Sequence, residues 1–336
     1  MASVSSHDET LDNELYNTLL NYILTAEDIK KWGFPYKHPT KPGRVTYNPL
    51  KCYNLSSDPA KQVCRCGKKV SLLKEDWYID PNGCDYIPKG LKRKKKKNNK
   101  ANNNANPPSE FFKSEYHVCC YHSLLEHEFV KASRKKENVS VNINAFALDT
   151  EMVYTTKGLE VAKVTVLSFP CCSVVYNTYV RPKNIITDYN TMYSGIRLED
   201  LAGITTTIED VQETLLSLFD KDSIIIGHGL ENDLLGLYFL HEKIIDTSIL
   251  IPHKKGFPYR QSLKRLAWKC LNKSIHNPSN AHDSIEDAQI CVQLVLWKMN
   301  TESKRSKKKR SRHAKKKDVM TAKEETVKNS EIKFEK

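Results

Sequence analysis

Hydrophobic and polar residues change their spacing several times between residues 142 and 300. Three runs with the apolar pattern of β-strands come first: NAFALDTEMV, VAKVTVLSF and SVVYNTYVRP. Helical and strand patterns then alternate through TIEDVQETLLSLFD, DSIIIGHG, ENDLLGLYFLHE, KIIDTSIL, RQSLKRLAWKCL and DSIEDAQICVQLVLWKM. Three consecutive strands followed by alternating helices and strands predict an α/β domain, a mixed sheet flanked by helices.

Residues 1–141 predict a small accessory region. Leucines and isoleucines recur at helical spacing between residues 10 and 24, and Thr25 with Asp28 predicts the start of a second short helix that Gly33 ends. Residues 34–50 hold four prolines and are expected to be extended. A cysteine-rich segment follows at residues 64–122. A Lys/Asn-rich insert, residues 89–110, interrupts it, and we expect this insert to be disordered.

The net charge of +13 is concentrated in two short runs. Residues 301–336, predicted to be a disordered tail, hold 14 Lys and Arg against 6 acids, and residues 89–100 hold eight more Lys and Arg with no acid. The remaining residues carry a net charge of −3. Such runs attract nucleic acid and are typical of proteins directed to the nucleus or nucleolus. For either run alone, a solvated segment without a targeting function is the alternative.

Cysteine usage and the N-terminus predict a reducing, intracellular compartment. Ten cysteines in 336 residues do not suggest a secreted disulfide scaffold, and four of them form adjacent pairs that rarely bridge each other. The first residues, MASVSSHDETLDNEL, lack the basic and apolar parts of a secretory signal. No apolar run approaches the roughly 20 residues that cross a bilayer, so we expect no membrane partner.

Four acids and one histidine in the second half form a candidate catalytic set: Asp149, Glu151, Asp233, His282 and Asp287. The first two are two apart near the carboxyl end of a predicted strand and therefore share a face. The third follows a buried strand, and the last two lie at the start of the closing helix. Taken singly, each of these residues could be an ordinary surface acid, an acid at a helix start or a loop histidine without a catalytic role. Together, four carboxylates can hold two divalent cations for attack on a phosphodiester, and a histidine can take a proton near neutral pH.

The order and context of these motifs resemble the DEDDh branch of the DEDD exonucleases. The segments ALDTEMVYTTKGLEVAKVTV, DYNTMYSGI, IIIGHGLENDLLGL, DTSILIPHKKG, RQSLKRLAWKCL and HDSIEDAQICVQL resemble the Rex-type RNA exonucleases, the RNA exonuclease 1 homologue group. The resemblance covers residues 142–299 and extends weakly upstream. It implies an RNase H-like fold, 3′→5′ exoribonuclease activity, two Mg²⁺ or Mn²⁺ ions on the four acids, and a base role for His282. Thr150 stands where the family usually has cysteine, and we expect it to face away from the acids.

Cysteines and histidines between residues 64 and 122 are candidate ligands of a structural zinc ion. The spacing is irregular, and a cysteine-lined small core is an equal alternative. Rex-type exonucleases with an upstream cysteine-rich segment show a similar CRCG and CC pattern, which favours zinc. The candidate set is Cys66, Cys84, Cys119 and His122.

Positive charge also gathers just before the last motif, where it could hold a phosphate backbone. A solvated helix face is an equal alternative for any one of these residues. The candidate RNA-binding residues are Lys254, Lys255, Arg260, Lys264 and Arg265, with Lys269 nearby, and Tyr154, Tyr193 and Tyr259 could stack on bases.

The sequence therefore predicts a metal-dependent 3′→5′ exoribonuclease in residues 142–300 that acts on RNA 3′ ends and releases nucleoside 5′-monophosphates. A DNA exonuclease is the alternative within the same class, because the preference for RNA rests on the resemblance and would require contacts to the 2′-OH. A non-catalytic RNA-binding scaffold is the alternative from another class.

Overall fold

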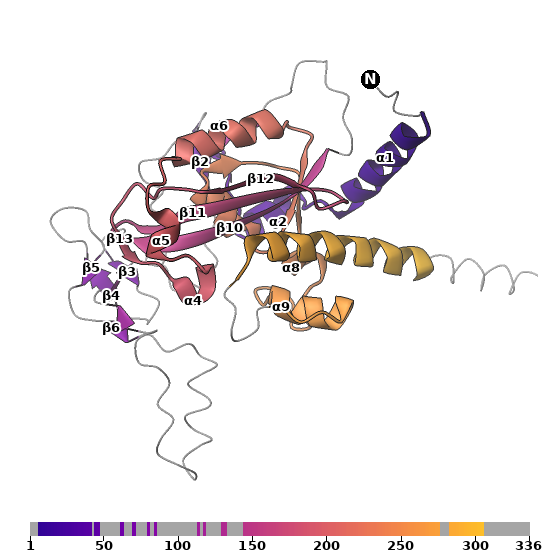
Figure 1. Ribbon diagram of the computed structural model, residues 1–336. Coiled ribbons are helices and arrows are strands. Elements are labelled where there is room, and N and C mark those ends of the chain that lie inside the picture. Colours follow the sequence, from indigo (N-terminus) through magenta and orange to yellow (C-terminus); the bar gives the residue numbers. More distant parts are fainter. Residues whose placement is uncertain are drawn as a thin grey trace, which may run out of the picture. The chain divides into compact units, whose positions relative to one another are not determined.

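The computed structural model describes residues 6–41, 44–47, 129–132, 144–275 and 282–305, together with short strands between residues 61 and 118 (Figure 1). These strands form three antiparallel pairs: β3 (Lys61–Val63) with β4 (Lys69–Ser71), β5 (Ile79–Asp80) with β8 (His117–Val118), and β6 (Cys84–Asp85) with β7 (Lys113–Ser114).

Several predictions fall on parts of the chain that the structure does not describe. They are the Lys/Asn-rich insert, the tail beyond residue 305 and the zinc set, of which only the backbone of Cys84 is described. Zinc binding therefore stays a prediction. Within the described residues, no helix is long and apolar enough to cross a membrane.

A mixed sheet forms the centre of the structure. Its strand order is β12 (Val174–Tyr179), β11 (Gly158–Ser168), β10 (Ala145–Thr155), β14 (Ile224–Gly227) and β16 (Ile244–Asp246). The first three strands pair antiparallel, β14 and β16 add to them in parallel, and β13 (Ile186–Asp188) pairs with the far end of β10. The predicted mixed sheet flanked by helices, the RNase H-like arrangement, is confirmed.

The two faces of the sheet are covered by different helices. Leu148 of β10 shares a hydrophobic core with Leu215 of α6 (Ile208–Leu218) and Leu234 of α7 (Leu230–Gly236). On the opposite face, the hydroxyl of Ser284, at the start of a helix over residues 284–305, lies 2.7 Å from that of Thr165 in β11. The chain forms two compact units divided between Val292 and Gln293, so this contact belongs to the first unit. The predicted closing helix is confirmed, but it continues through residue 305, so the prediction that the disordered tail begins at residue 301 is wrong.

Three predicted elements differ from the structure. The helix expected through ENDLLGLYFLHE ends at Gly236, because Tyr238 adopts a positive φ of 49° and the chain continues as β15 (Phe239–Leu240) beside β9 (Val130–Lys131). The strand expected through KIIDTSIL stops at Asp246, whose side chain caps α8 (Thr247–Leu250). The helix expected through RQSLKRLAWKCL is α9 (Leu263–Leu266) followed by a π-helical turn, η3 (Ala267–Leu271).

The N-terminal segment contains α1 (Ser6–Leu19), η1 (Leu20–Tyr22), α2 (Ala26–Lys31) and a hairpin of β1 (Tyr36–Lys37) and β2 (Val45–Thr46). The predicted cap is confirmed, because the Thr25 hydroxyl accepts the Asp28 N–H at 3.1 Å. Ile29 and Phe34 belong to the same hydrophobic core as α6 and α7. The backbone N–H of Leu24 also donates to the carbonyl of Ile244 in β16 at 2.8 Å. This segment is therefore part of the core around the sheet.

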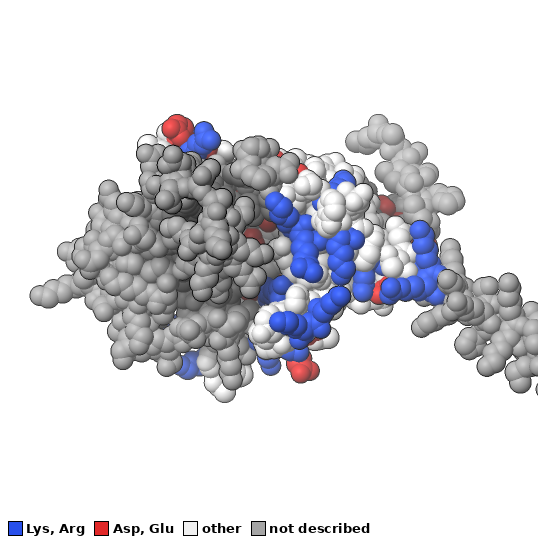
Figure 2. Space-filling view, turned by 90° about the horizontal axis from the view of Figure 1, so that it is seen from below, with Lys and Arg blue, Asp and Glu red and all other residues white. Residues whose placement is uncertain are grey.

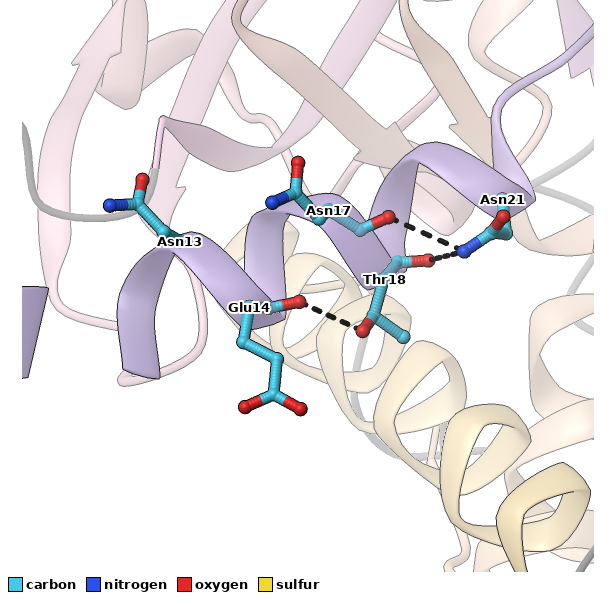
Figure 3. A pocket seen from close by; sticks show the side chains of 5 residues that line it. All are labelled: Asn13, Glu14, Asn17, Thr18 and Asn21. Atoms are coloured by element: carbon cyan, nitrogen blue, oxygen red, sulfur yellow. Dashed lines mark hydrogen bonds between the residues drawn. The ribbon is translucent and has the colours of Figure 1, made fainter. Parts of the chain in front are cut away.

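An open depression on α1 and η1 is lined by polar side chains (Figure 3). The Thr18 hydroxyl donates to the Glu14 carbonyl at 2.8 Å, and the Asn21 amide donates to the carbonyls of Asn17 and Thr18. These bonds satisfy carbonyls of the helix itself. The lining therefore holds no cluster of titratable groups that would support chemistry.

Replacing Phe34 with alanine should lower the free energy of unfolding by about 3–5 kcal/mol, because a fully buried aromatic side chain leaves a cavity in the shared core. Leu198→Ala, at a side chain that is 64% exposed, is the matched control and should change stability by less than about 0.5 kcal/mol. Urea unfolding followed by circular dichroism measures both. Equal stability of Phe34→Ala and wild type would show that the N-terminal segment does not belong to the core.

Candidate active site

Asp149 and Glu151 lie in the middle of β10, one of the two longest strands of the sheet. β10 continues to Thr155, so the prediction that these acids lie at the carboxyl end of their strand is wrong. The parallel partner β14 is shorter, however, and its pairing with β10 ends at Ala147 and Ile226. Both acids therefore lie just beyond the carboxyl end of β14, where α/β sheets place their ligands.

Asp233 is placed by a rigid turn between β14 and α7. A Cβ on Gly227 would lie 2.8 Å from the Leu148 carbonyl oxygen, and Gly229 has a φ of 75°, so both positions favour glycine. One carboxylate oxygen of Asp246 accepts the backbone N–H groups of Gly229 and Leu230, each at 2.9 Å. These bonds fix the start of α7, and Asp233 lies in its first turn.

Thr150 faces Asp233, so the prediction that it points away from the acids is wrong. Its backbone N–H and its hydroxyl both donate to Oδ1 of Asp233, at 3.0 and 2.7 Å. Thr150 does lie on the opposite strand face from Asp149 and Glu151, as alternation requires. That face carries α7, because Leu148 two residues earlier packs with Leu234, and α7 supplies the third acid. The acids therefore converge from both faces of β10.

His282 and Asp287 lie together at the start of the last helix, as predicted. The Asp283 carboxylate accepts the Ile285 N–H at 3.0 Å and fixes the first turn. Asp287 then lies one turn inside, and its Oδ2 is 3.3 Å from Nδ1 of His282. The Asp287 side chain is 6% exposed and that of His282 is 35% exposed, so the histidine lies at the mouth of a buried acidic site. The ring of Tyr193 lies edge-on to the imidazole, with centroids 6.5 Å apart.

Burial and mutual repulsion raise the pKa values of the clustered acids. Burial raises the pKa of Asp149 well above its usual range, and the charges of Asp233, Glu151 and Asp287 add to this. Burial, followed by the charges of Asp287 and Asp233, raises the pKa of Glu151 to about 9. Burial raises the pKa of Asp233 to about 7, even though its hydrogen bonds from Thr150 lower it. The four acids thus act on one another through a poorly solvated space.

The donor set suits hard divalent cations. Oε1 of Glu151 is buried and has no hydrogen-bond partner, and carboxylate oxygens are the ligands that Mg²⁺ and Mn²⁺ prefer. Among the described residues, no three His, Cys, Asp or Glu side chains already stand as ligands around one point. Oxygens of Asp233 and Asp287 are instead engaged by Thr150 and His282. The residues fit such cations by chemistry, burial and charge.

Comparison with known proteins agrees with this arrangement. Residues 146–295 match the exonuclease family RNase_T, and residues 2–51 match a family described as ElonginA binding-protein 1. Residues 146–295 form an exonuclease domain of the RNase_T family. All four acids and His282 lie within these bounds.

Relatives extend the match beyond the exonuclease domain. RNA exonuclease 1 homolog of Homo sapiens is 35% identical over 308 residues, which cover 86% of this chain and 24% of that protein. RNA exonuclease 1 of Saccharomyces cerevisiae is 41% identical over 155 residues, covering 46% of this chain and 28% of that protein. The predicted resemblance to this group is confirmed, and the chain spans about a quarter of the length of these two relatives.

One similar solved structure is the Neurospora crassa Pan2 catalytic unit (protease and nuclease domain). It is 23% identical to this chain, with a TM-score of 0.44, and the match covers 56% of this chain and 32% of that one.

An ion pair that the sequence did not predict supports the exonuclease domain beside Asp233. The Arg260 guanidinium contacts the Glu231 carboxylate at 2.6 Å, donates to the Trp32 carbonyl at 3.2 Å and stacks 4.8 Å from the centre of the Trp32 ring. Burial raises the pKa of Glu231 to about 8, although Arg260 opposes the shift. Arg260, a candidate RNA contact, thus has internal partners, and it connects the N-terminal segment to α7.

The other candidate RNA-binding cations are on the surface of the exonuclease domain. Figure 2 shows Lys and Arg side chains gathered on the side of the molecule where α9 lies in Figure 1. The exposed cations around α9 and the loop before it are Lys254, Lys255, Lys264, Arg265 and Lys269. Among the candidate aromatic residues, Tyr259 is 53% exposed and Tyr193 is 39% exposed, whereas Tyr154 is half-buried.

Replacing Glu151 with glutamine should stabilise the protein at pH 8 and not at pH 4, in metal-free buffer. The folded-state pKa of about 9 lies above the ordinary value of 4.5, so the folded state keeps a proton that the unfolded state loses between these values. Wild-type stability therefore falls as pH rises through this window, and Glu151→Gln removes that loss. The gain at pH 8 should exceed about 1.4 kcal/mol, the equivalent of one pKa unit.

Urea unfolding of both proteins from pH 4 to pH 9 measures this difference. Glu213→Gln, at an exposed position of α6, is the control and should follow the wild-type curve. A Glu151→Gln variant that is no more stable than wild type at pH 8 would contradict the burial and repulsion assigned to this carboxylate.

Proposed function

We propose that this protein is a metal-dependent 3′→5′ exoribonuclease that releases nucleoside 5′-monophosphates from RNA 3′ ends. One observation carries the proposal: Asp149, Glu151, Asp233 and Asp287 converge from a strand and two helices into a buried site beside His282. Clustering four carboxylates destabilises the fold, and a non-catalytic scaffold would gain nothing from it. The presence of all four acids and His282 therefore argues against that alternative.

The four carboxylates are proposed to hold two Mg²⁺ or Mn²⁺ ions. Such ions, when bound, would neutralise charge on the phosphate and lower the pKa of a bound water. The protein supplies a rigid cradle for them, because β10 is held on both sides by neighbouring strands and α7 is fixed by Asp246. Thr150 orients the Asp233 carboxylate by holding one of its oxygens.

His282 is proposed to take the proton from the attacking water. Asp287 lies 3.3 Å from Nδ1, so it can orient the ring and stabilise its protonated form, and Nε2 can then accept the proton. A side chain that is 35% exposed can reach both the buried acids and a substrate that enters from solvent.

RNA is the proposed substrate. Relatives of this chain are named RNA exonucleases, and exposed lysines around α9 provide charge for a phosphate backbone. DNA carries the same backbone charge, so discrimination would depend on contacts to the 2′-OH. A DNA substrate is therefore tested in the same experiment.

A nuclear location is also proposed. It is supported by the runs LKRKKKK and KRSKKKRSRHAKKK, whose charge is typical of nuclear targeting segments. A fluorescent fusion of the full chain should accumulate in nuclei, and replacing the lysines and arginines of both runs with glutamine should abolish this accumulation. An unchanged distribution would contradict the proposal.

Degradation of a 5′-labelled oligonucleotide tests the function directly. In Mg²⁺, wild type should shorten the labelled RNA one nucleotide at a time from its 3′ end, should act less on DNA of the same sequence, and should stop with EDTA. Asp233→Asn should lower the rate by at least about a hundredfold, because it removes a proposed cation ligand. Glu213→Gln is the control. Absence of RNA shortening, or near-normal activity of Asp233→Asn, would contradict the proposal.

His282→Ala should lower the single-turnover rate by about 10²–10⁴-fold, the usual effect of losing a general base. The loss should persist with saturating RNA and Mg²⁺, and added imidazole should restore part of it. A loss that extra Mg²⁺ reverses would instead assign the histidine to metal binding, and a rate close to wild type would remove it from the mechanism.

A further inference from the structure

We infer that residues 253–269 form a binding surface for single-stranded RNA upstream of the 3′ end, with the indole of Trp268 as a stacking platform for bases. This inference rests on the proposed exoribonuclease function and adds a second contact region to the acidic site. It concerns the loop before α9, the helix α9 and the π-helical turn η3.

The first observation is the positive charge of this stretch. Between Asp246 and Asp283 the chain has no acidic residue, although it contains 40 in total, and the same stretch holds seven Lys and Arg. Their side chains are exposed except that of Arg260, which pairs with Glu231. An acid-free group of exposed cations fits a polyanionic strand.

The second observation is the exposure of large aromatic rings in the same stretch. Phe257 is 44% exposed, Tyr259 is 53% exposed and Trp268 is 64% exposed. Lysine ammonium groups lie near two of these rings: Lys31 is 5.3 Å from the Phe257 centroid and Lys255 is 5.2 Å from that of Tyr259. Aromatic rings interleaved with lysines are the combination that binds single-stranded nucleic acid, because the rings stack on bases while the cations pair with phosphates.

The third observation is the position of this stretch relative to the acidic site. Arg260 joins this stretch to Glu231, two residues before Asp233 on α7, and the backbone of the next residue, Gln261, hydrogen-bonds to His228. His228 is itself close enough to Asp287 to sense its charge. Residues 260 and 261, in the middle of the stretch, therefore lie beside the acidic site, and α9 follows them in the chain.

Trp268 follows α9 in the chain. It is six residues beyond Ser262, the cap of α9, or about 9 Å at 1.5 Å per residue. It sits in the π-helical turn, a distortion that is frequent at functional sites. A strand whose 3′ end lies at the acids and which follows α9 would meet Trp268 upstream of that end, so the contribution of Trp268 should depend on RNA length.

Equilibrium binding of RNA of two lengths tests the inference. The probes are 5′-fluorescein oligouridines of 4 and 15 nucleotides, and the full-length chain is titrated in EDTA, where degradation does not interfere. Trp268→Ala should weaken binding of the 15-mer by about tenfold, the usual effect of losing one stacking platform, and should affect the 4-mer much less. Trp268→Phe retains a ring and should lie between Trp268→Ala and wild type.

Ile185→Ala is the matched control, since Ile185 is also 64% exposed but lies outside this surface, and it should bind as wild type does. Lys264→Gln should reduce the salt dependence of 15-mer affinity: the slope of the logarithm of the binding constant against the logarithm of salt concentration should fall in magnitude by about one. Thermal unfolding confirms that each variant is folded.

Three results would overturn the inference: wild-type affinity of Trp268→Ala for the 15-mer, an equal loss for both lengths, or no measurable binding of the 15-mer by wild type. The last result would favour a protein as the occupant of this surface. Because binding is measured without divalent cations, failure of wild type to degrade RNA in Mg²⁺ would contradict the proposed function and leave this test unaffected.

Discussion

Repulsion among four clustered carboxylates is the constraint on which the rest of this structure depends. Glu151, Asp233 and Asp287 are buried and Asp149 is half-buried beside them, and the charges of their neighbours raise the pKa values of Asp149 and Glu151. No local preference of the chain favours such a cluster. It persists because β10, α7 and the start of the last helix are each fixed by interactions made elsewhere.

Asp246 shows how a buried acid behaves when its task is structural. Its two oxygens accept hydrogen bonds from the backbone of Gly229, Leu230 and Ser248 and from the Ser248 hydroxyl, at 2.6–2.9 Å. Glu151, by contrast, has a buried oxygen with no partner. Asp246 stabilises the fold by ordering α7, whereas Glu151 destabilises it and remains available for a ligand. Structural acids such as Asp246 thus hold the elements that carry the candidate catalytic acids, which themselves cost stability, as is common at active sites.

The site could be predicted from sequence because its five residues lie in short segments with clear local patterns. An apolar strand precedes Asp233, a helix start follows His282, and alternation along β10 places Asp149 and Glu151 together. The role of Thr150 was missed because alternation along one strand does not show that α7 brings the third acid onto the other face.

Contacts between distant parts of the chain could not be predicted in the same way. The stacking of Trp32 on Arg260 joins residues 228 positions apart, and nothing in either local pattern indicates it. The early end of α7 depends on one positive φ at Tyr238, a residue that does not favour this conformation. The fold class follows from local patterns, whereas the supports of the site follow from tertiary packing.

We expect the four clustered carboxylates to form a site for two divalent cations. Calorimetric titration of metal-free protein with Mn²⁺ tests it most directly, because Mn²⁺ favours oxygen ligands and binds thiolates weakly. Binding of Mn²⁺ should saturate at two ions per chain and should be lost or reduced to one ion in Asp149→Ala, and the acids should release protons as the ions bind. Absence of saturable binding, or binding of Mn²⁺ that Asp149→Ala leaves unchanged, would contradict it.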